Sequence, residues 1–242
     1  MLFLIGLGLN ADSISEEGLN LVKKCKKIYL ENYTVELPYS TQHLEEVIGK
    51  KLFPADREFV ESLKIIDEAR KLDVALLIYG NPLMATTHIT MVQESNLSGV
   101  KCKVVHNATV LDAVGVTGLQ IYKFGKIASM PKWDEKKKFT PDSFMKIVKE
   151  NSSIGAHSLI LVDIGLQFPD ALNELKISAK NQEVSLSKII VGQQIGTKNQ
   201  KILYRPLSEL EGFKGVKAPF CFILPGKLHF VESEYLESFQ KE

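Results

Sequence analysis

The chain has 242 residues, and its 30 Lys and Arg nearly balance its 29 Asp and Glu, for a formal net charge of +1. This balance argues against a nucleic-acid groove or a membrane-surface patch, and no apolar run approaches the roughly 20 residues of a membrane span. The three cysteines form no C-x-x-C pair, which favours a reducing, cytoplasmic compartment. We expect one large domain or two small ones.

Predicted strands and helices alternate in the first half of the chain. An apolar run over residues 2–7 predicts a strand buried on both faces, and Ser13 and Ser15 are candidate caps for the helix that follows. Further strands are predicted over 27–32, 73–79 and 101–106, and helices over 41–50, 56–71 and 82–95. This alternation is typical of a parallel sheet.

The alternation weakens after residue 112. Strands are predicted within 125–131, 157–165, 187–196, 201–207 and 220–231, and helices over 141–151 and near 167–177. Short strands separated by Gly and Pro turns are typical of a mixed, partly antiparallel sheet. The predicted fold is therefore two α/β domains, residues 1–112 with a mostly parallel sheet and residues 113–242 with a mixed sheet.

Polar residues follow two of the apolar strands directly. "YGNPLMATTH" (79–88) places a Gly-Asn-Pro turn and then Thr86, Thr87 and His88 after one strand, and "HNATV" (106–110) follows the next. If these parallel strands are neighbours, their ends form a shared crevice at the edge where open α/β sheets bind ligands. The same side chains could instead cap helices, and the sequence alone leaves both interpretations open.

The first glycine loop offers a competing interpretation. "GLGLNA" (6–11) fits the dinucleotide fingerprint, and Glu31 at the end of the second predicted strand could bind a ribose. An NAD-dependent oxidoreductase using Gly6, Gly8, Ala11 and Glu31 is therefore an alternative. That motif needs a helix beginning within the glycine loop, whereas the first cap signals here come later, at Ser13 and Ser15.

Other catalytic patterns are missing from the sequence. The five histidines show no H-x-H or H-x-x-x-H spacing, so we expect no metal site. Neither G-x-S-x-G nor Walker A occurs, and we name no catalytic residue. The run Lys136-Lys137-Lys138 is expected to be a solvated loop or, at most, a docking patch for a partner.

Five segments occur in an order that resembles a known family. They are "FLIGLGL", "GNPLMATTH", "HNATVLDAVGVTGLQIYKFGK", "HSLILVDI" and "PGKLHFVESEYL", and together they nearly span residues 2–236. They resemble diphthine synthases, of the tetrapyrrole-methylase-like class of S-adenosylmethionine-dependent methyltransferases. The resemblance implies two α/β domains with the cofactor in the cleft between them, commonly in a homodimer.

The resemblance also implies the reaction. The substrate would be translation elongation factor 2, in which one histidine already carries a 3-amino-3-carboxypropyl group. The enzyme would methylate the amine of that group repeatedly to give diphthine, with S-adenosylhomocysteine as the product of each transfer. A tetrapyrrole (precorrin) methyltransferase of the same class is an alternative, and so is a binding module that has lost activity.

The cofactor contacts follow from the same resemblance, residue by residue. They are Leu9, Asn81, Met84, Thr109, Val110, Val162, Ile195 and His229. The family usually has Asp at the position of Asn81 and Ala-Arg-Ala-Gly at 193–196, where this chain reads Gln-Gln-Ile-Gly. We expect Asn81 to contact the polar tail of the cofactor more weakly than Asp would. Thr86, Thr87 and His88 are expected near the methyl group, where His88 or solvent could take up the proton of the amine.

Overall fold

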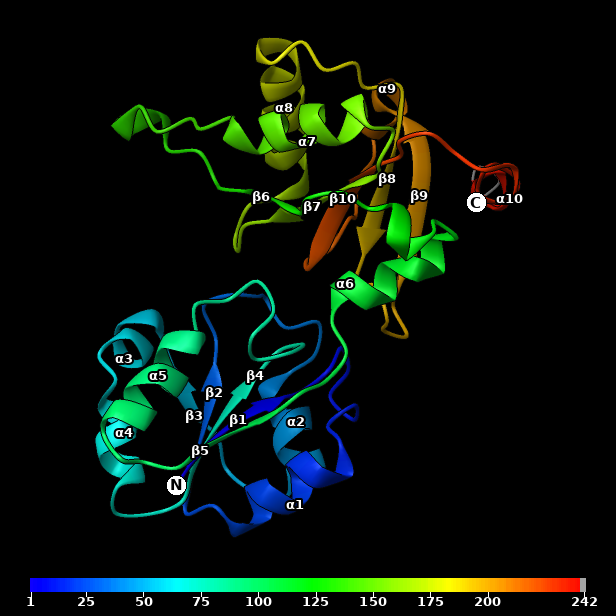
Figure 1. Cartoon of the computed structure of the whole chain (residues 1–242). Coiled ribbons are helices and arrows are strands. Elements are labelled where there is room, and N and C mark those ends of the chain that lie inside the picture. Colours follow the sequence, from blue (N-terminus) through cyan, green and yellow to red (C-terminus); the bar gives the residue numbers. More distant parts are fainter. Residues whose placement is uncertain (240–242) are drawn as a thin grey trace. The chain divides into compact units, whose positions relative to one another are not determined.

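The computed structural model describes residues 1–239, and the chain divides into two compact units, Met1–Leu111 and a second that begins at Asp112 (Figure 1). The elements of the first unit are β1 (Leu2–Gly6), α1 (Glu16–Lys24), β2 (Lys27–Glu31), α2 (Thr41–Ile48), β3 (Phe53–Ala55), α3 (Arg57–Glu61), α4 (Lys64–Ala69), β4 (Val74–Ile78), α5 (Ile89–Leu97) and β5 (Cys102–Val105). A short helix, α6 (Val110–Ala113), crosses the boundary between the units.

The first unit is a five-stranded parallel sheet in the order β3-β2-β4-β1-β5. Its central strands β1 and β4 are buried at every position and consist of apolar residues and one glycine. Such strands need cover on both faces, and α1 and α2 pack on one face while α3, α4 and α5 pack on the other (Figure 1). The predicted parallel sheet is confirmed.

The sheet has a topological switch point between β1 and β4. These two strands are hydrogen-bonded neighbours in register, with Leu2 opposite Val74 and Gly6 opposite Ile78. The chain leaves β1 toward α1 on one face and leaves β4 toward α5 on the opposite face. Loops that diverge in this way open the carboxyl edge of the sheet, where open α/β folds bind ligands.

Two helix predictions in this unit were wrong in extent. The segment 56–71 forms two helices, because Leu63 adopts a left-handed backbone with φ 58° and the Ser62 hydroxyl donates to the Phe59 carbonyl at 2.7 Å. The segment 82–95 becomes helical only at Ile89, where α5 begins. Both hydrophobic patterns continue across local turns whose hydroxyl groups compete for the helical carbonyls.

The second unit is built around a mixed sheet. Its elements are β6 (Ala128–Met130), α7 (Ser143–Ser153), β7 (Ser158–Val162), α8 (Phe168–Asn181), β8 (Lys188–Gln193), β9 (Lys201–Pro206), α9 (Leu207–Leu210), β10 (Phe220–Leu224) and α10 (Phe230–Ser238), with 3₁₀ turns at Val114–Thr117, Ile121–Lys123 and Glu135–Lys137. The strand order is β6-β7-β10-β8-β9, and only β6 and β7 run parallel. The predicted mixed sheet is confirmed.

Helices α7 and α8 cover one face of the second sheet (Figure 1). Phe144 and Met145 of α7 and Leu175 of α8 lie in one apolar cluster with β7, β8 and β10. The predicted strand segment 220–231 ends at Leu224, and α10 begins at Phe230. The helix begins there because His229 and Glu232 form a reciprocal capping box.

A buried ionic cluster anchors α10 to the rest of the second unit. The side chains of His157 and Glu232 are fully buried, with His157 Nε2 3.1 Å from Glu232 Oε1. The Gly226 amide donates to His157 Nδ1 at 2.8 Å, so the ring is neutral and Nε2 carries the proton. Glu232 also accepts hydrogen bonds from the Gln120 amide and the Lys123 ammonium. One carboxylate therefore joins α10 to two other segments.

Acid should destabilise this cluster. Burial lowers the pKa of His157 below its usual 6.5, because the charged ring would lose its hydration. Burial also opposes ionisation of Glu232, but hydrogen bonds from His229, Lys123, Gln120 and His157 outweigh it and lower its pKa from 4.5 to about 2. Both groups bind protons more readily in the unfolded chain, so stability falls as the pH falls.

We therefore predict that the thermal unfolding midpoint declines progressively from about pH 6.5 toward pH 2, over the interval bounded by these pKa values. Glu232→Gln should destabilise the wild-type fold by about 3 kcal/mol at neutral pH, because Lys123 loses its buried counter-charge. The variant should also lose the part of the decline below pH 4.5 that Glu232 causes. Calorimetric scans across this range test both, and identical pH profiles for the two proteins would contradict the assignment.

Candidate functional site

The backbones that follow β1 and β4 are hydrogen-bonded to each other at the switch point. Gly8 N donates to Gly80 O at 3.2 Å, and Gly80 N donates to Gly8 O at 3.0 Å. Both residues have a left-handed backbone, with φ 70° and 71°. At Gly6, a Cβ atom would lie 2.6 Å from the Gly80 carbonyl oxygen. Only glycine allows the two loops to approach this closely.

Asn107, in the loop after β5, joins that loop to the one after β1. Its Nδ2 donates to Gly6 O at 3.0 Å and to Ser13 O at 2.9 Å, while Oδ1 accepts from the Ala108 amide at 2.8 Å. Both N–H donors and the oxygen of the amide thus bond to backbone groups of the edge. Asn107 was not singled out from the sequence.

Asn81 links the loop after β4 to the loop after β5. Its Nδ2 donates to Asn107 O at 3.1 Å, and its Oδ1 lies 3.2 Å from His106 Nδ1 and accepts weakly from Leu83 N at 3.3 Å. Strands β4 and β5 are not neighbours, which was the condition for the predicted crevice, because β1 lies between them. Their loops nevertheless meet, since both reach across the carboxyl end of β1.

The loop from Pro82 to His88 has a defined internal structure. Ala85 has a left-handed backbone with φ 57°, and the Thr86 hydroxyl donates to Pro82 O at 2.6 Å. His88 is 1% exposed, with Nδ1 3.1 Å from Pro82 O and Nε2 3.4 Å from the Tyr33 hydroxyl. Because a carbonyl only accepts, Nδ1 carries a proton and donates it to Pro82 O. Both ring nitrogens are engaged, so His88 positions the loop and has no free nitrogen to act as a base.

Five of the residues named by the resemblance lie in these three linked loops or, for Val110, at the start of α6, which follows the third loop directly. They are Leu9, Asn81, Met84, Thr109 and Val110. Leu9 is buried and its carbonyl accepts from the Tyr79 hydroxyl at 3.4 Å, whereas the Met84 side chain is 45% exposed. Thr109 is buried, and its hydroxyl accepts from Leu111 N at 2.9 Å. The edge combines apolar side chains with amide and backbone groups, a lining suited to binding.

The dinucleotide alternative does not fit this geometry. Helix α1 begins at Glu16, eight residues after Gly8, where the Ser15 hydroxyl accepts from Gly18 N at 3.1 Å. The Gly8 amide is bonded to Gly80 and does not face a helix axis. Glu31 is buried and accepts from the amides of Tyr33 and Thr34 at 2.7 and 2.8 Å, so its carboxylate holds its own loop.

The remaining residues named by the resemblance belong to the second unit. Val162 ends β7, and Ile195 follows the end of β8. Both strand ends flank the start of β10, because Cys221 pairs with Leu161 and Phe220 pairs with Gln193. His229 follows the opposite end of β10 and is the N-cap of α10. The strand register thus places Val162 and Ile195 at the end of the second sheet where β10 begins. His229 lies beyond the end where β10 finishes.

Gln193 and Gln194 act as internal braces. Gln193 accepts from Lys217 N at 2.8 Å and donates to Asn199 O at 3.2 Å. Gln194 donates from its side chain to Ala218 O at 2.6 Å and has a left-handed backbone with φ 46°. The two amides fix the β8–β9 hairpin against the segment that precedes β10. The segment at 193–196, where the sequence departs from the family's Ala-Arg-Ala-Gly, is therefore held by side-chain hydrogen bonds.

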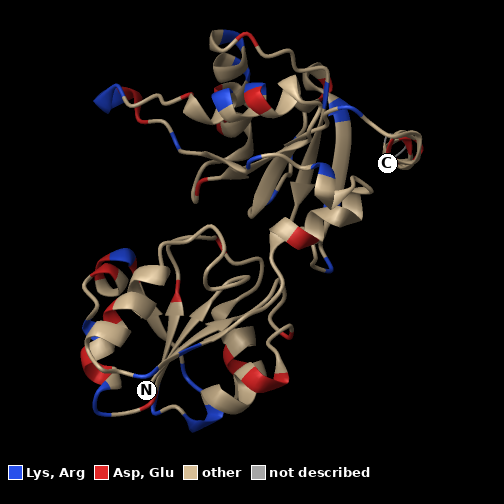
Figure 2. Cartoon of the chain, viewed as in Figure 1, with Lys and Arg blue, Asp and Glu red and all other residues tan. Residues whose placement is uncertain are grey.

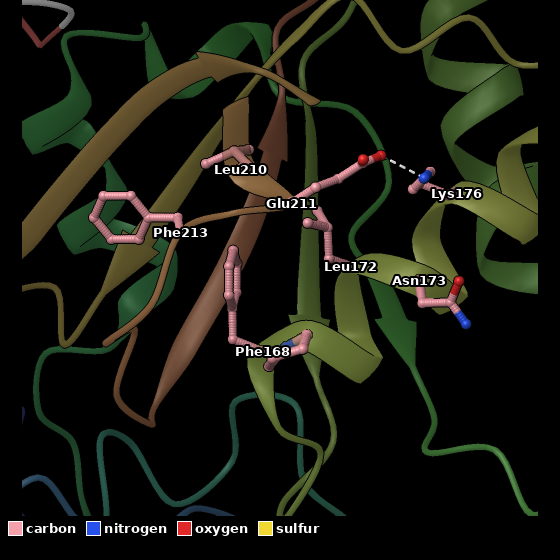
Figure 3. Close-up of a pocket in the computed structure, with 8 residues that line it drawn as sticks. Phe168, Leu172, Asn173, Lys176, Leu210, Glu211 and Phe213 are labelled. Atoms are coloured by element: carbon pink, nitrogen blue, oxygen red, sulfur yellow. Dashed lines mark hydrogen bonds and ion pairs between the residues drawn. The ribbon is translucent and has the colours of Figure 1, made fainter. Parts of the chain in front are cut away.

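A shallow pocket lies elsewhere in the second unit (Figure 3). Its base is apolar, formed by Phe168, Leu172 and Leu210, and the Lys176–Glu211 ion pair lies at its rim. The pocket contains none of the residues named by the resemblance. Its shape follows from the packing of α8 beside α9, and it has no titratable group apart from that ion pair.

Residues 1–239 contain neither a candidate metal site nor a candidate membrane-spanning helix. No group of three or more His, Cys, Asp or Glu side chains in this part of the chain is arranged to hold a metal ion. None of the helices described there is long and apolar enough to cross a bilayer.

Comparison with known proteins identifies the class. The sequence model of the family described as Tetrapyrrole (Corrin/Porphyrin) Methylases matches residues 1–211. A probable diphthine methyl ester synthase of Arabidopsis thaliana is 34% identical over 274 residues, covering 99% of this chain and 98% of that protein. A diphthine synthase of Methanocaldococcus jannaschii is 34% identical over 253 residues, covering 98% of each.

Solved structures agree with this relationship. A crystal structure of a diphthine synthase superposes with a TM-score of 0.89 at 29% identity, covering 99% of this chain and 96% of that one. The chain therefore belongs to the diphthine synthase family of the tetrapyrrole methylases, and it is an S-adenosylmethionine-dependent methyltransferase. The resemblance read from the sequence is confirmed.

The cross-links at the carboxyl edge can be tested on Asn107. Asn107→Ala leaves the Gly6 and Ser13 carbonyls unpaired and should destabilise the chain by about 2–4 kcal/mol. Asn107→Asp should cost more, because an anion then faces two carbonyl oxygens. The matched control is Asn96→Ala on the exposed surface of α5, which should change stability little. Denaturant titrations measure all three, and an Asn107→Ala variant as stable as the control would contradict the cross-link.

Proposed function

We propose that the carboxyl edge of the first sheet binds S-adenosylmethionine and that the chain methylates the amine of 3-amino-3-carboxypropyl-histidine on translation elongation factor 2 repeatedly, giving diphthine. The observation that carries the proposal is the linkage of three loops at the switch point by Gly8, Gly80, Asn81 and Asn107. The linkage gathers the five first-unit residues of the proposed contact set. S-adenosylhomocysteine is the proposed product.

The polar and apolar groups of the carboxyl edge suit S-adenosylmethionine as a ligand. Asn81 Oδ1 is an acceptor that suits the ammonium of an amino-acid tail, and the exposed Met84 offers an apolar, polarisable surface beside it. Backbone groups of the loops can bind a nucleoside. Val162, Ile195 and His229 are proposed as contributors from the second unit. When bound, the cofactor supplies a methyl group whose leaving group is a neutral thioether.

Under this proposal the residues of the chain bind and orient the reactants, and they do not act as acid or base. His88 has both ring nitrogens engaged, and Tyr79 and Tyr39 have pKa values raised far above neutrality by burial. The substrate amine reaches the methyl group in its neutral form and releases its proton to solvent. Alignment of two bound reactants can itself lower the barrier by several kcal/mol, roughly 7–11 at best.

Esterification of the substrate carboxylate is a second candidate activity. It is favoured by the names of relatives from Arabidopsis thaliana and Homo sapiens, which are methyl ester synthases, whereas the Methanocaldococcus jannaschii relative is a diphthine synthase. N-methyl groups resist alkali, and a methyl ester is hydrolysed by it. We further propose a cytoplasmic location, on the pattern of the three cysteines, and a homodimer, on the resemblance alone.

The cofactor contact at Asn81 can be tested by calorimetric titration with S-adenosylmethionine and S-adenosylhomocysteine. Asn81→Leu should weaken binding about tenfold or more, the equivalent of one lost hydrogen bond. Asn81→Asp should bind more tightly than Asn81→Leu, because it keeps the Oδ1 acceptor and adds a negative charge near the ammonium of the cofactor, although it loses the bond from Nδ2 to Asn107 O. Asn96→Leu, on an exposed face of α5, is the control. Unchanged affinity in Asn81→Leu would exclude Asn81 from the site.

The reaction can be tested with purified elongation factor 2 that carries the 3-amino-3-carboxypropyl group and with labelled S-adenosylmethionine. Mass spectrometry before and after alkali counts the N-methyl groups and separates them from an ester. We expect alkali-stable methyl groups on one histidine. Transfer to a precorrin and not to the protein would establish the tetrapyrrole alternative, and cofactor binding with no transfer to either would indicate a binding module.

A further inference from the structure

A basic hairpin protrudes from the second unit between β6 and α7 (Figure 1). It comprises residues 132–140, here called the basic hairpin. Asp134 and Phe139 pair through their backbones, with N–O distances of 2.9 and 3.0 Å. Lys137 N bonds to Asp134 O at 3.1 Å, and Lys138 closes the turn with φ 54°. The charged run, predicted as a solvated loop or at most a docking patch, is therefore a hydrogen-bonded turn.

The base of the basic hairpin is held by buried groups. Trp133 N donates to Glu174 Oε1 at 3.2 Å, and Trp133 Nε1 donates to Pro141 O at 3.0 Å. Glu174 is 6% exposed, and its Oε2 has no hydrogen-bond partner among residues 1–239. Burial accordingly raises the pKa of Glu174. Burying the Glu174 carboxyl with only one of its two oxygens hydrogen-bonded lowers the stability of the fold. The bonded oxygen is the one that holds the base of the basic hairpin.

The tip of the basic hairpin presents cations together with one aromatic ring. The side chains of the three consecutive lysines, Lys136, Lys137 and Lys138, are exposed to solvent (Figure 2). Phe139, which follows them, is 52% exposed. Lys137 pairs with Asp134 at 3.2 Å. Lys136 and Lys138 form no ion pair with any residue in the described part of the chain. An exposed aromatic ring is a feature of interfaces, and the unpaired ammonium groups next to it in the chain favour an acidic partner.

The basic hairpin begins beside a residue of the proposed contact set. Met130 pairs with Val162 across the parallel strands β6 and β7, and Asp163 N donates to Met130 O at 3.0 Å. Lys132 N then donates to Asp163 Oδ2 at 3.2 Å. The hairpin thus leaves the same sheet edge at which β7 ends in Val162. The base of the basic hairpin, at Lys132, therefore lies next to that edge.

The charge pattern favours an acidic protein over a nucleic acid. The basic hairpin carries four lysines, including Lys132, against Asp134 and Glu135, and the whole chain has a net charge of only +1. Nucleic-acid binding typically draws on about 6–10 phosphate contacts over an extended surface. A small cationic tip with an aromatic ring instead suits steering and orientation of a protein with a complementary acidic patch.

We propose that the basic hairpin docks an acidic surface patch of the protein substrate and so orients that substrate for methyl transfer; this rests on the function proposed above. The hairpin acts in recognition of the folded substrate and takes no part in the chemistry. Its removal should therefore raise the KM for the protein substrate and leave kcat and the cofactor affinity unchanged.

The test is steady-state methyl transfer by the full chain to modified elongation factor 2, with calorimetry of S-adenosylmethionine on the same samples. Lys136→Glu/Lys137→Glu/Lys138→Glu should raise the KM on the order of tenfold and remove most of its salt dependence. The control is Lys26→Glu/Lys71→Glu/Lys101→Glu, an equal charge reversal on exposed lysines at the amino edge of the first sheet. Lys136→Gln/Lys138→Gln keeps the Lys137–Asp134 pair and should give a smaller rise, even if the triple variant folds poorly.

The outcomes separate the two proposals. An active wild type whose hairpin variants keep its KM, or shift it no more than the control, overturns docking and leaves the function standing. A wild type that binds the cofactor but methylates no protein overturns the function, and docking with it. Loss of binding to a single-stranded RNA oligonucleotide, with KM unchanged, assigns the basic hairpin to nucleic acid and overturns docking on protein.

Discussion

The close contact between the backbones after β1 and β4 is the constraint on which the first unit depends. Gly8 and Gly80 exchange two hydrogen bonds, and no Cβ atom fits at Gly6. The contact brings two loops of opposite direction together at the switch point. Asn107 then closes the arrangement by donating to carbonyls on both sides of the first glycine loop. The edge is thus defined by backbone geometry and by two amide side chains.

An edge built in this way suits a reaction that depends on alignment. Its polar groups are mostly engaged with each other, and His88 is held in the interior by Pro82 and Tyr33. Transfer of a sulfonium methyl group needs no proton donated to the leaving group. The proposed binding edge therefore needs no free acid–base pair, which agrees with the lack of a recognisable catalytic motif in the sequence.

The sequence predicted the class of both sheets, because continuous apolar strands and short strands with Gly and Pro turns carry that information locally. It did not predict that β1 separates β4 from β5, and so missed Asn107, whose partners lie about a hundred residues away along the chain. The role of Glu31 as a loop cap and the pairing of His157 with Glu232 likewise depend on tertiary contacts. The break between α3 and α4 at Leu63 was not predicted, because the spacing of hydrophobic residues continues through it.

Hydrogen exchange with and without S-adenosylhomocysteine tests the central claim most directly, because it reports binding residue by residue without turnover. With the proposed site, the ligand should slow exchange in residues 79–88 and 106–110, the loops after β4 and β5, and leave the amino edge of the same sheet unchanged. Binding that slows exchange elsewhere in the chain, with these two loops unaffected, would contradict that site.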